Sequence, residues 1–147
     1  MIGYRNILCA TDLSDHCRVA AQCAADLARR YGAQLTLLHV VDHFPEDRSN
    51  EEIAPEDADP ATYRDRQARA ALAELARTLG LESVTQAVLF TTQSAAREIV
   101  RYAEEQHTDL IVIASHGRHG ITATLGSTAH SVAQAAPCDM LTVRCKT

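Results

Sequence analysis

The sequence lacks the features that mark secreted, membrane-spanning and nucleic-acid-binding proteins. Its 147 residues include no tryptophan, and only 4% are aromatic. No apolar run approaches the roughly 18 residues that cross a bilayer, and the start has no signal-peptide pattern. The formal net charge of −5 argues against nucleic acid as the main partner. We therefore expect a cytoplasmic protein, folded as a single domain over residues 1–147, that binds neither a membrane nor nucleic acid.

The five cysteines show no disulfide framework. Their number is odd, no Cys-x-x-Cys pair occurs, and nothing else suggests secretion. Cys9 and Cys145 lie in apolar, strand-like runs, Cys17 and Cys23 fall in a helical pattern, and Cys138 follows a proline. We expect reduced thiols, most of them buried.

Several motifs of nucleotide-dependent and hydrolytic enzymes are also absent. The chain has no Gly-x-x-x-x-Gly-Lys-Ser/Thr loop and no Gly-x-Gly-x-x-Gly after its first strand. It has neither the Ser-Gly-Gly-x-Asp-Ser loop of pyrophosphate-forming ligases nor the His-x-Gly-His of nucleotidylyl transferases. Gly-x-Ser-x-Gly is missing as well. The sequence therefore carries none of these enzyme signatures.

What is present is a strict alternation of apolar runs and helical patterns. Strands are predicted over residues 5–10, 34–41, 84–90, 109–114 and 139–145. Helices are predicted after Ser14, from Thr62, after Ser94 and from Ser127, and Gly32 and Gly80 end the first two. In the first helix we expect one buried stripe, formed by Val19, Ala20, Cys23, Ala24, Leu27, Ala28 and Tyr31.

This alternation predicts an α/β fold with a doubly wound, Rossmann-like parallel sheet of five strands and helices on both faces. With the strand order 3-2-1-4-5, the crevice that binds ligands lies beyond the ends of the first and fourth strands. Residues 42–61 break the rhythm, because they hold three of the four prolines and many carboxylates. We interpret them as an exposed acidic loop, since the carboxylates lack the spacing of a metal-binding loop.

The segment from Asp109 to Thr128 contains a glycine-rich loop directly after the fourth strand. Gly117 and Gly120 lie in this loop, and Gly126 precedes a new helical pattern. A strand, a glycine loop and a helix start form an arrangement that binds phosphate through backbone N–H groups. The alternative is that the glycines only turn the chain and that Ser127 only caps a helix. The loop alone leaves both readings open.

Other polar residues near this crevice also have two readings. Asp12 can orient a ribose or a metal ion, or it can cap the first helix. His116 and His119, with His130, raise the hypothesis of a zinc site, but their spacing is loose for zinc. In a loop directed at phosphate, histidine ring N–H groups can instead donate to the anion. Arg118 suits a phosphate partner better than a structural role.

On these residues the chain resembles a universal stress protein of the small, single-domain bacterial type. ILCATDLSD is similar to the first-strand signature of the family, and LTLLHVVD is similar to its second strand. REIVRYAEEQHTDLIVIASHGRHG and LGSTAHSVAQAAPCDMLTVR resemble its third helix, fourth strand, loop, last helix and last strand. The resemblance covers essentially the whole chain.

Members of this family that bind ATP carry Gly-x-x-Gly, nine residues and then Gly-Ser/Thr. This chain has Ala114-Ser115-His116-Gly117, eight residues and then Gly126-Ser127. Ala114 replaces the first glycine, and its methyl group could crowd a ribose or phosphate. The spacer is one residue shorter, which could shift the amides of Gly126 and Ser127.

The resemblance implies a nucleotide site. Its adenine and ribose side would involve Ala10, Thr11 and Asp12, with the Asp12 carboxylate accepting from ribose hydroxyls. Val41 would contact the adenine through its backbone. The phosphates of ATP, ADP or AMP would lie near Ala114 and the histidines of the loop, bridged by Mg²⁺ and held by Gly117, Arg118, Gly126, Ser127 and Thr128.

The leading hypothesis is therefore an ATP-binding stress-response or signalling module. The alternative is an interaction protein that binds no nucleotide and acts through its dimer surface. An ATPase is a third reading, and its hydrolysis would be slow because only His116 and His119 lie near the loop as candidate bases. A homodimer through the last strand, residues 139–145, is expected because this apolar strand would otherwise leave an open sheet edge.

Overall fold

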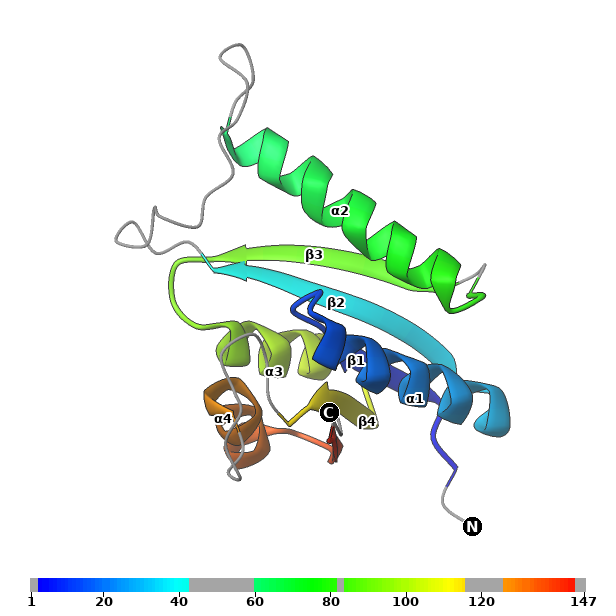
Figure 1. The fold of residues 1–147 in the computed structure, drawn as a ribbon. Coiled ribbons are helices and arrows are strands. Elements are labelled where there is room, and N and C mark those ends of the chain that lie inside the picture. The colour runs from blue at the N-terminus through cyan, green and yellow to red at the C-terminus, as the bar shows by residue number, and fades with distance from the viewer. Residues whose placement is uncertain (1–2, 43–59, 82–83, 116–125, 145–147) are drawn as a thin grey trace.

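A computed structural model describes residues 3–42, 60–81, 84–115 and 126–144 of the chain. Strands and helices alternate along these residues (Figure 1). In chain order the elements are β1 (Asn6–Ala10), α1 (Asp15–Tyr31), β2 (Gln34–Asp42), α2 (Pro60–Thr78), β3 (Thr85–Thr91), α3 (Ala95–Glu105), β4 (Leu110–Ala114), α4 (Ser127–Ala135) and β5 (Asp139–Val143).

The five strands form one parallel sheet in the order β3-β2-β1-β4-β5, which confirms the predicted topology. β1 lies at the centre and pairs with two neighbours, so that Ala10 is in register with Leu38 of β2 and with Ile113 of β4. The chain moves outward from β1 in one direction through β2 and β3, and in the other through β4 and β5. In doubly wound sheets, ligands bind where the strand order reverses, which in this sheet is beyond the ends of β1 and β4.

Helices cover both faces of the sheet (Figure 1). Side chains of α1 and α2 pack against one face, where Ile7 and Cys9 of β1 point. Side chains of α3 and α4 pack against the other face, which receives Leu8 and Ala10. Successive residues of a strand face opposite sides, so β1 serves two cores at once. Because both faces of β1 and of β4 are covered, the sequences of these strands are nearly continuous apolar runs.

The predicted stripe of α1 is partly wrong. Val19 and Tyr31, which we expected to point inward, are 39% and 46% exposed. The buried face consists mostly of small residues, namely Cys17, Ala20, Ala21, Ala24, Ala25 and Ala28. Small side chains let a helix approach the sheet closely, which places the larger Val19 and Tyr31 on its flanks. Spacing alone did not distinguish between these overlapping stripes.

The boundaries of the predicted acidic loop also change. Asp42 is the last residue of β2, and Pro60 is the first residue of α2. Residues 43–59 lie outside the described ranges, so the predicted exposure of this loop remains a prediction. Among the helices that the structure describes, none is both long and apolar enough to cross a membrane.

Candidate functional site

The candidate site begins with the turn between β1 and α1. Thr11 follows β1, and its Oγ1 accepts a hydrogen bond from the N–H of Leu13 at 3.0 Å. Ser14 is the N-cap of α1, since its side chain accepts from the N–H of Cys17 at 3.4 Å. Asp12 is therefore not the cap. Its Oδ1 accepts from the N–H of Ser14 at 2.9 Å, and its carboxylate thereby braces the turn that precedes the helix.

Two further contacts tie this turn to β2. The N–H of Thr11 donates to the carbonyl oxygen of Leu38 at 2.9 Å. The carbonyl oxygen of Thr11 lies 2.8 Å from Nδ1 of His39. A carbonyl oxygen can only accept, so Nδ1 of His39 carries the hydrogen in this contact. His39 is not among the predicted site residues. Its signal in the sequence is a histidine between the apolar residues Leu38 and Val40 of β2.

Val41 lies near the end of the same strand. It is half-buried, packs against the core beneath α1 and α2, and is in register with Phe90 of β3. Ala10, by contrast, is only 4% exposed, with its side chain in the opposite core. Thr11, Asp12 and Val41 thus lie at the carboxyl end of the sheet, where the sequence placed them. Ala10 presents almost no side-chain surface there.

The second part of the site is the end of β4. Ala114 is 5% exposed, and its methyl group packs in the core beneath α1 and α2. The next residue, Ser115, donates its N–H to the carbonyl oxygen of Val143 at 2.9 Å. The carbonyl oxygen of Ser115 accepts from the N–H of Gly126 at 2.6 Å. This hydrogen bond holds the end of β4 next to the start of α4.

Among the described residues, no side chain caps the start of α4. Gly126 occupies the N-cap position without a side-chain hydrogen bond, and the first turn has no acidic residue. Ser127 and Thr128 of this turn are exposed. Uncapped N–H groups at a helix start attract anions, which is the property that the phosphate hypothesis needs.

Buried hydroxyl groups mark the ends of three strands. In the described residues, the buried polar side chains are Thr11, Thr91 and Ser115. Thr11 accepts from Leu13, and Thr91 accepts from the N–H of Gln93 at 3.0 Å. Within the described part of the chain, Oγ of Ser115 has no hydrogen-bond partner, although the residue is only 3% exposed. An unpartnered buried hydroxyl is costly, so this one calls for a hydrogen-bond partner beyond the described residues.

Four predicted site residues lie outside the described ranges, namely His116, Gly117, Arg118 and His119. His130 is described and lies exposed on α4. Among described residues there is no group of three His, Cys, Asp or Glu side chains that could hold a metal ion. Because two of its three histidines are outside these ranges, the zinc hypothesis stays untested.

The described cysteines are free thiols, as expected. Cys9 and Cys17 are buried, and Cys23 and Cys138 are half-buried. Burial raises the pKa of both Cys9 and Cys17, in the case of Cys17 to about 11. Both buried thiols are thus protonated at neutral pH and are poor nucleophiles.

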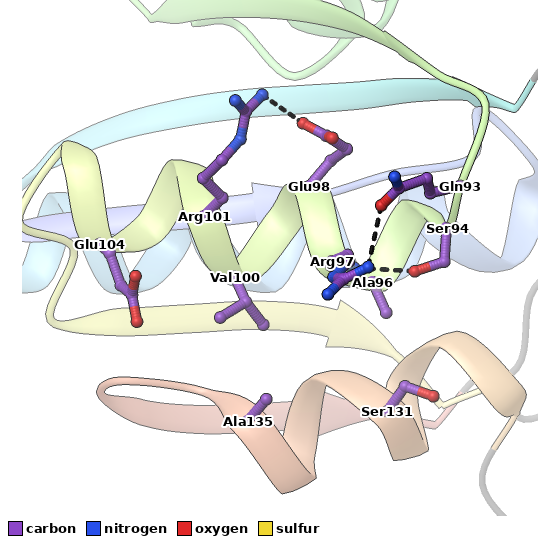
Figure 2. Close-up of a pocket in the computed structure, with 10 residues that line it drawn as sticks. All are labelled: Gln93, Ser94, Ala96, Arg97, Glu98, Val100, Arg101, Glu104, Ser131 and Ala135. Carbon is purple, nitrogen blue, oxygen red and sulfur yellow. Dashed lines mark hydrogen bonds and ion pairs between the residues drawn. The ribbon is translucent and has the colours of Figure 1, made fainter.

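A separate hollow of about 560 Å³ lies between α3 and α4 (Figure 2). None of the predicted site residues line it. Its arginines already have partners nearby. Nη1 of Arg97 donates to Oε1 of Gln93, just before the N-cap of α3, at 2.9 Å, and Arg101 pairs with Glu98 on the same helix. This hollow is therefore distinct from the candidate site at the ends of β1 and β4.

Comparisons with known proteins agree on one family. Residues 3–144 match the Universal stress protein family. The chain is 34% identical over 140 residues to universal stress protein A homolog 1 of Coxiella burnetii, covering 95% of this chain and 96% of that one. It is also 34% identical over 147 residues to homolog 2 of the same organism, with 99% of each chain covered.

Solved structures share the fold. The universal stress protein UspA from Lactobacillus plantarum matches with a TM-score of 0.71 and 26% identity over 98% of this chain and all of that one. A universal stress protein in complex with cAMP matches with a TM-score of 0.71 and 23% identity, covering 97% and 98% of the two chains. The Archaeoglobus fulgidus protein in complex with dAMP matches with a TM-score of 0.66 and 21% identity, covering 96% and 98%. At these identities, the last two show the fold alone.

Proposed function

The chain belongs to the universal stress protein family, and on this basis we propose that it is a cytoplasmic, homodimeric stress-response module that binds an adenine nucleotide. The observation that carries the proposal is the buried Ser115 hydroxyl, which has no partner within the described residues. It lies at the end of β4, next to the uncapped start of α4. A ligand oxygen at this point would satisfy both the hydroxyl and the helix N–H groups.

The roles follow from where the residues lie. Asp12 would accept from ribose hydroxyls, with Ala10 and Thr11 behind it and the backbone of Val41 towards the adenine. Gly126, Ser127 and Thr128 would bind phosphate through the first turn of α4. By family resemblance, His116, Gly117, Arg118 and His119 would add contacts from the loop. Mg²⁺ would bridge the phosphates and neutralise part of their charge.

Ala114 is compatible with this arrangement. In ATP-binding relatives a glycine occupies its position, and an added methyl group could have crowded the ligand. In this chain the methyl group is part of the packed core, and the residue is 5% exposed. A residue this buried presents little surface to a ligand beyond the ends of β1 and β4. The other departure, the shorter spacer, falls in residues 118–125, outside the described ranges.

The proposed dimer uses the edge of the sheet. β5 is an edge strand that pairs only with β4 in the described sheet, and Met140, Leu141, Thr142 and Val143 are half-buried. Its other edge offers backbone N–H and C=O groups to a second strand. A second copy of β5 would cover this edge and its apolar side chains. Sedimentation that finds only monomer at micromolar concentration would contradict this assembly.

The test of nucleotide binding is direct. The purified protein is denatured, any released nucleotide is identified by mass, and ATP with Mg²⁺, AMP and cAMP are then titrated by calorimetry. We expect binding that Asp12→Ala weakens by at least about 10-fold, since hydrogen bonds to charged groups contribute about 1.5–3 kcal/mol. Gly117→Ala should also weaken it.

Thr92→Ala is the matched control, because Thr92 occupies the position of Asp12 in the corresponding turn after β3. This variant should bind as the parent does. If the parent protein releases no nucleotide and gives no heat with millimolar ATP, the proposal fails, and the dimer surface becomes the place to look for function.

A further inference from the structure

The Cys17 thiol lies against the residue that we expect to meet the ribose. Ser14 caps α1 through the N–H of Cys17, so Cys17 belongs to the first helical turn. From there its Sγ accepts a hydrogen bond from the backbone N–H of Asp12 at 3.4 Å. Cys17 is 3% exposed and packs in the core beneath α1. A buried thiol of α1 is thus hydrogen-bonded to the main chain of the turn between β1 and α1.

The thiol also interacts with the Asp12 carboxylate. Its pKa rises to about 11, mainly through burial, and a hydrogen bond with the Asp12 side chain and the charge of that carboxylate raise it further. At neutral pH the thiol is therefore protonated and can donate S–H to the carboxylate. One side chain then accepts from the main chain of Asp12, and its pKa responds to the carboxylate of the same residue.

The turn needs such restraint. Leu13 has a φ of 66°, in the left-handed region that non-glycine residues seldom adopt. Thr11 and Ser14 hold the main chain on either side of it. Neither of them contacts the N–H of Asp12, which donates to the Cys17 sulfur.

We propose that Cys17 is a positioning residue for Asp12, and that its thiol keeps the carboxylate oriented to accept from the hydroxyls of a bound ribose. This inference rests on the proposed function, since it assigns the sugar specificity of that site. The Cys17 thiol itself would not contact the nucleotide. If Cys17 positions Asp12, the preference of the protein for ribonucleotides over 2′-deoxyribonucleotides should depend on the side chain at position 17.

The experiment compares ATP with 2′-deoxy-ATP, both with Mg²⁺, in the parent and three variants. Cys17→Ala should lose about 3- to 10-fold in ATP affinity, the range of one ordinary hydrogen bond, and less for 2′-deoxy-ATP. The ratio of the two affinities should therefore move towards one. Cys17→Ser should restore most of the ratio, because a hydroxyl can accept and donate at the same place.

Cys9→Ala is the matched control. Cys9 is a fully buried thiol in the same core, on β1, but it has no hydrogen bond to Asp12 among the described contacts. This variant should melt at a lower temperature yet keep the parent ratio of ATP to 2′-deoxy-ATP affinity. If Cys17→Ala keeps that ratio too, or loses affinity for both nucleotides equally, the inference is overturned.

A second measurement needs no nucleotide and separates this inference from the proposed function. Amide hydrogen exchange of Asp12 in the free protein should be faster in Cys17→Ala than in the parent, Cys17→Ser or Cys9→Ala. Unchanged exchange in Cys17→Ala would overturn the positioning role. If the parent binds neither nucleotide, the proposed function and the ribose preference both fail, and the exchange rates still decide whether Cys17 holds Asp12.

Discussion

The turn between β1 and α1 and the turn between β3 and α3 use the same hydrogen bonds. Buried Thr11 directly follows β1, and buried Thr91 is the last residue of β3. The Oγ1 of each threonine accepts a hydrogen bond from the backbone N–H two residues later at 3.0 Å. Three residues after each threonine comes the serine that caps the next helix, Ser14 or Ser94. The sequences TDLS and TTQS thus form the same local structure.

The two turns differ in placement and in two residues. The first lies at the centre of the sheet, where the strand order reverses, whereas the second follows the edge strand β3. The first contains Asp12 and the left-handed Leu13, where the second has Thr92 and Gln93. Shared capping bonds therefore explain how both helices start. The proposed binding site depends, in addition, on the central position and on the Asp12 carboxylate.

The largest expected difference between the two turns is the effect of alkaline pH on the free energy of unfolding. The third helical residue is Cys17 after the first turn and Arg97 after the second. The pKa of Cys17 is about 11 in the folded protein against an ordinary value of 9.0. A raised pKa means that the folded state holds this proton more tightly. Its contribution to stability is therefore complete below pH 9 and is lost as the pH rises to 11, on the order of 2 kcal/mol.

The measurement is urea unfolding at pH 8, 9.5 and 11 for the parent and Cys17→Ser. The variant should lose less stability over this range, because its hydroxyl does not titrate. Cys9 titrates in both proteins, since burial raises its pKa too, so the difference between the two curves reports Cys17. Equal losses would show that the Cys17 thiol does not couple folding to pH.

The buried hydroxyls offer a second contrast. Thr91→Val should destabilise the protein by about 1–2 kcal/mol, because it leaves the N–H of Gln93 without its acceptor. Ser115→Ala removes a hydroxyl that has no partner among the described residues, so its free energy of unfolding should be unchanged or slightly higher. Nucleotide affinity should fall in Ser115→Ala only. A stability loss in Ser115→Ala as large as that in Thr91→Val would mean that this hydroxyl serves the fold.

Removing the caps should destabilise the protein less than removing the Thr91 hydroxyl does. Ser14→Ala and Ser94→Ala should each lower the free energy of unfolding by about 1 kcal/mol, the usual value for an N-cap. The similarity of the two turns predicts similar losses by chemical unfolding. Only Ser14→Ala should also reduce nucleotide affinity, since the Ser14 N–H donates to Asp12 and a looser cap loosens that contact. If both Ser14→Ala and Ser94→Ala lowered nucleotide affinity, the first turn would not differ from the second in its role in binding.

The sequence by itself determined the order of the elements, the parallel sheet and its topology. Local rules account for this, because β1 and β4 are short apolar runs, Ser14 and Ser94 cap helices, and Gly32 at φ 64° ends α1. It also placed Asp12, Thr11 and the start of α4 at one end of the sheet, since parallel strands bring their carboxyl ends together.

Only the tertiary structure decided which side chains touch. It showed that Val19 lies outside the buried stripe, that the Ala114 methyl group is in the core, and that the Ser115 hydroxyl is buried without a partner among the described residues. It also joined Cys17 to Asp12 and His39 to Thr11. Sequence periodicity specifies which face of an element is apolar. It does not specify the packing distance or the hydrogen-bond geometry that bring a thiol, a hydroxyl or a ring nitrogen to a particular backbone atom.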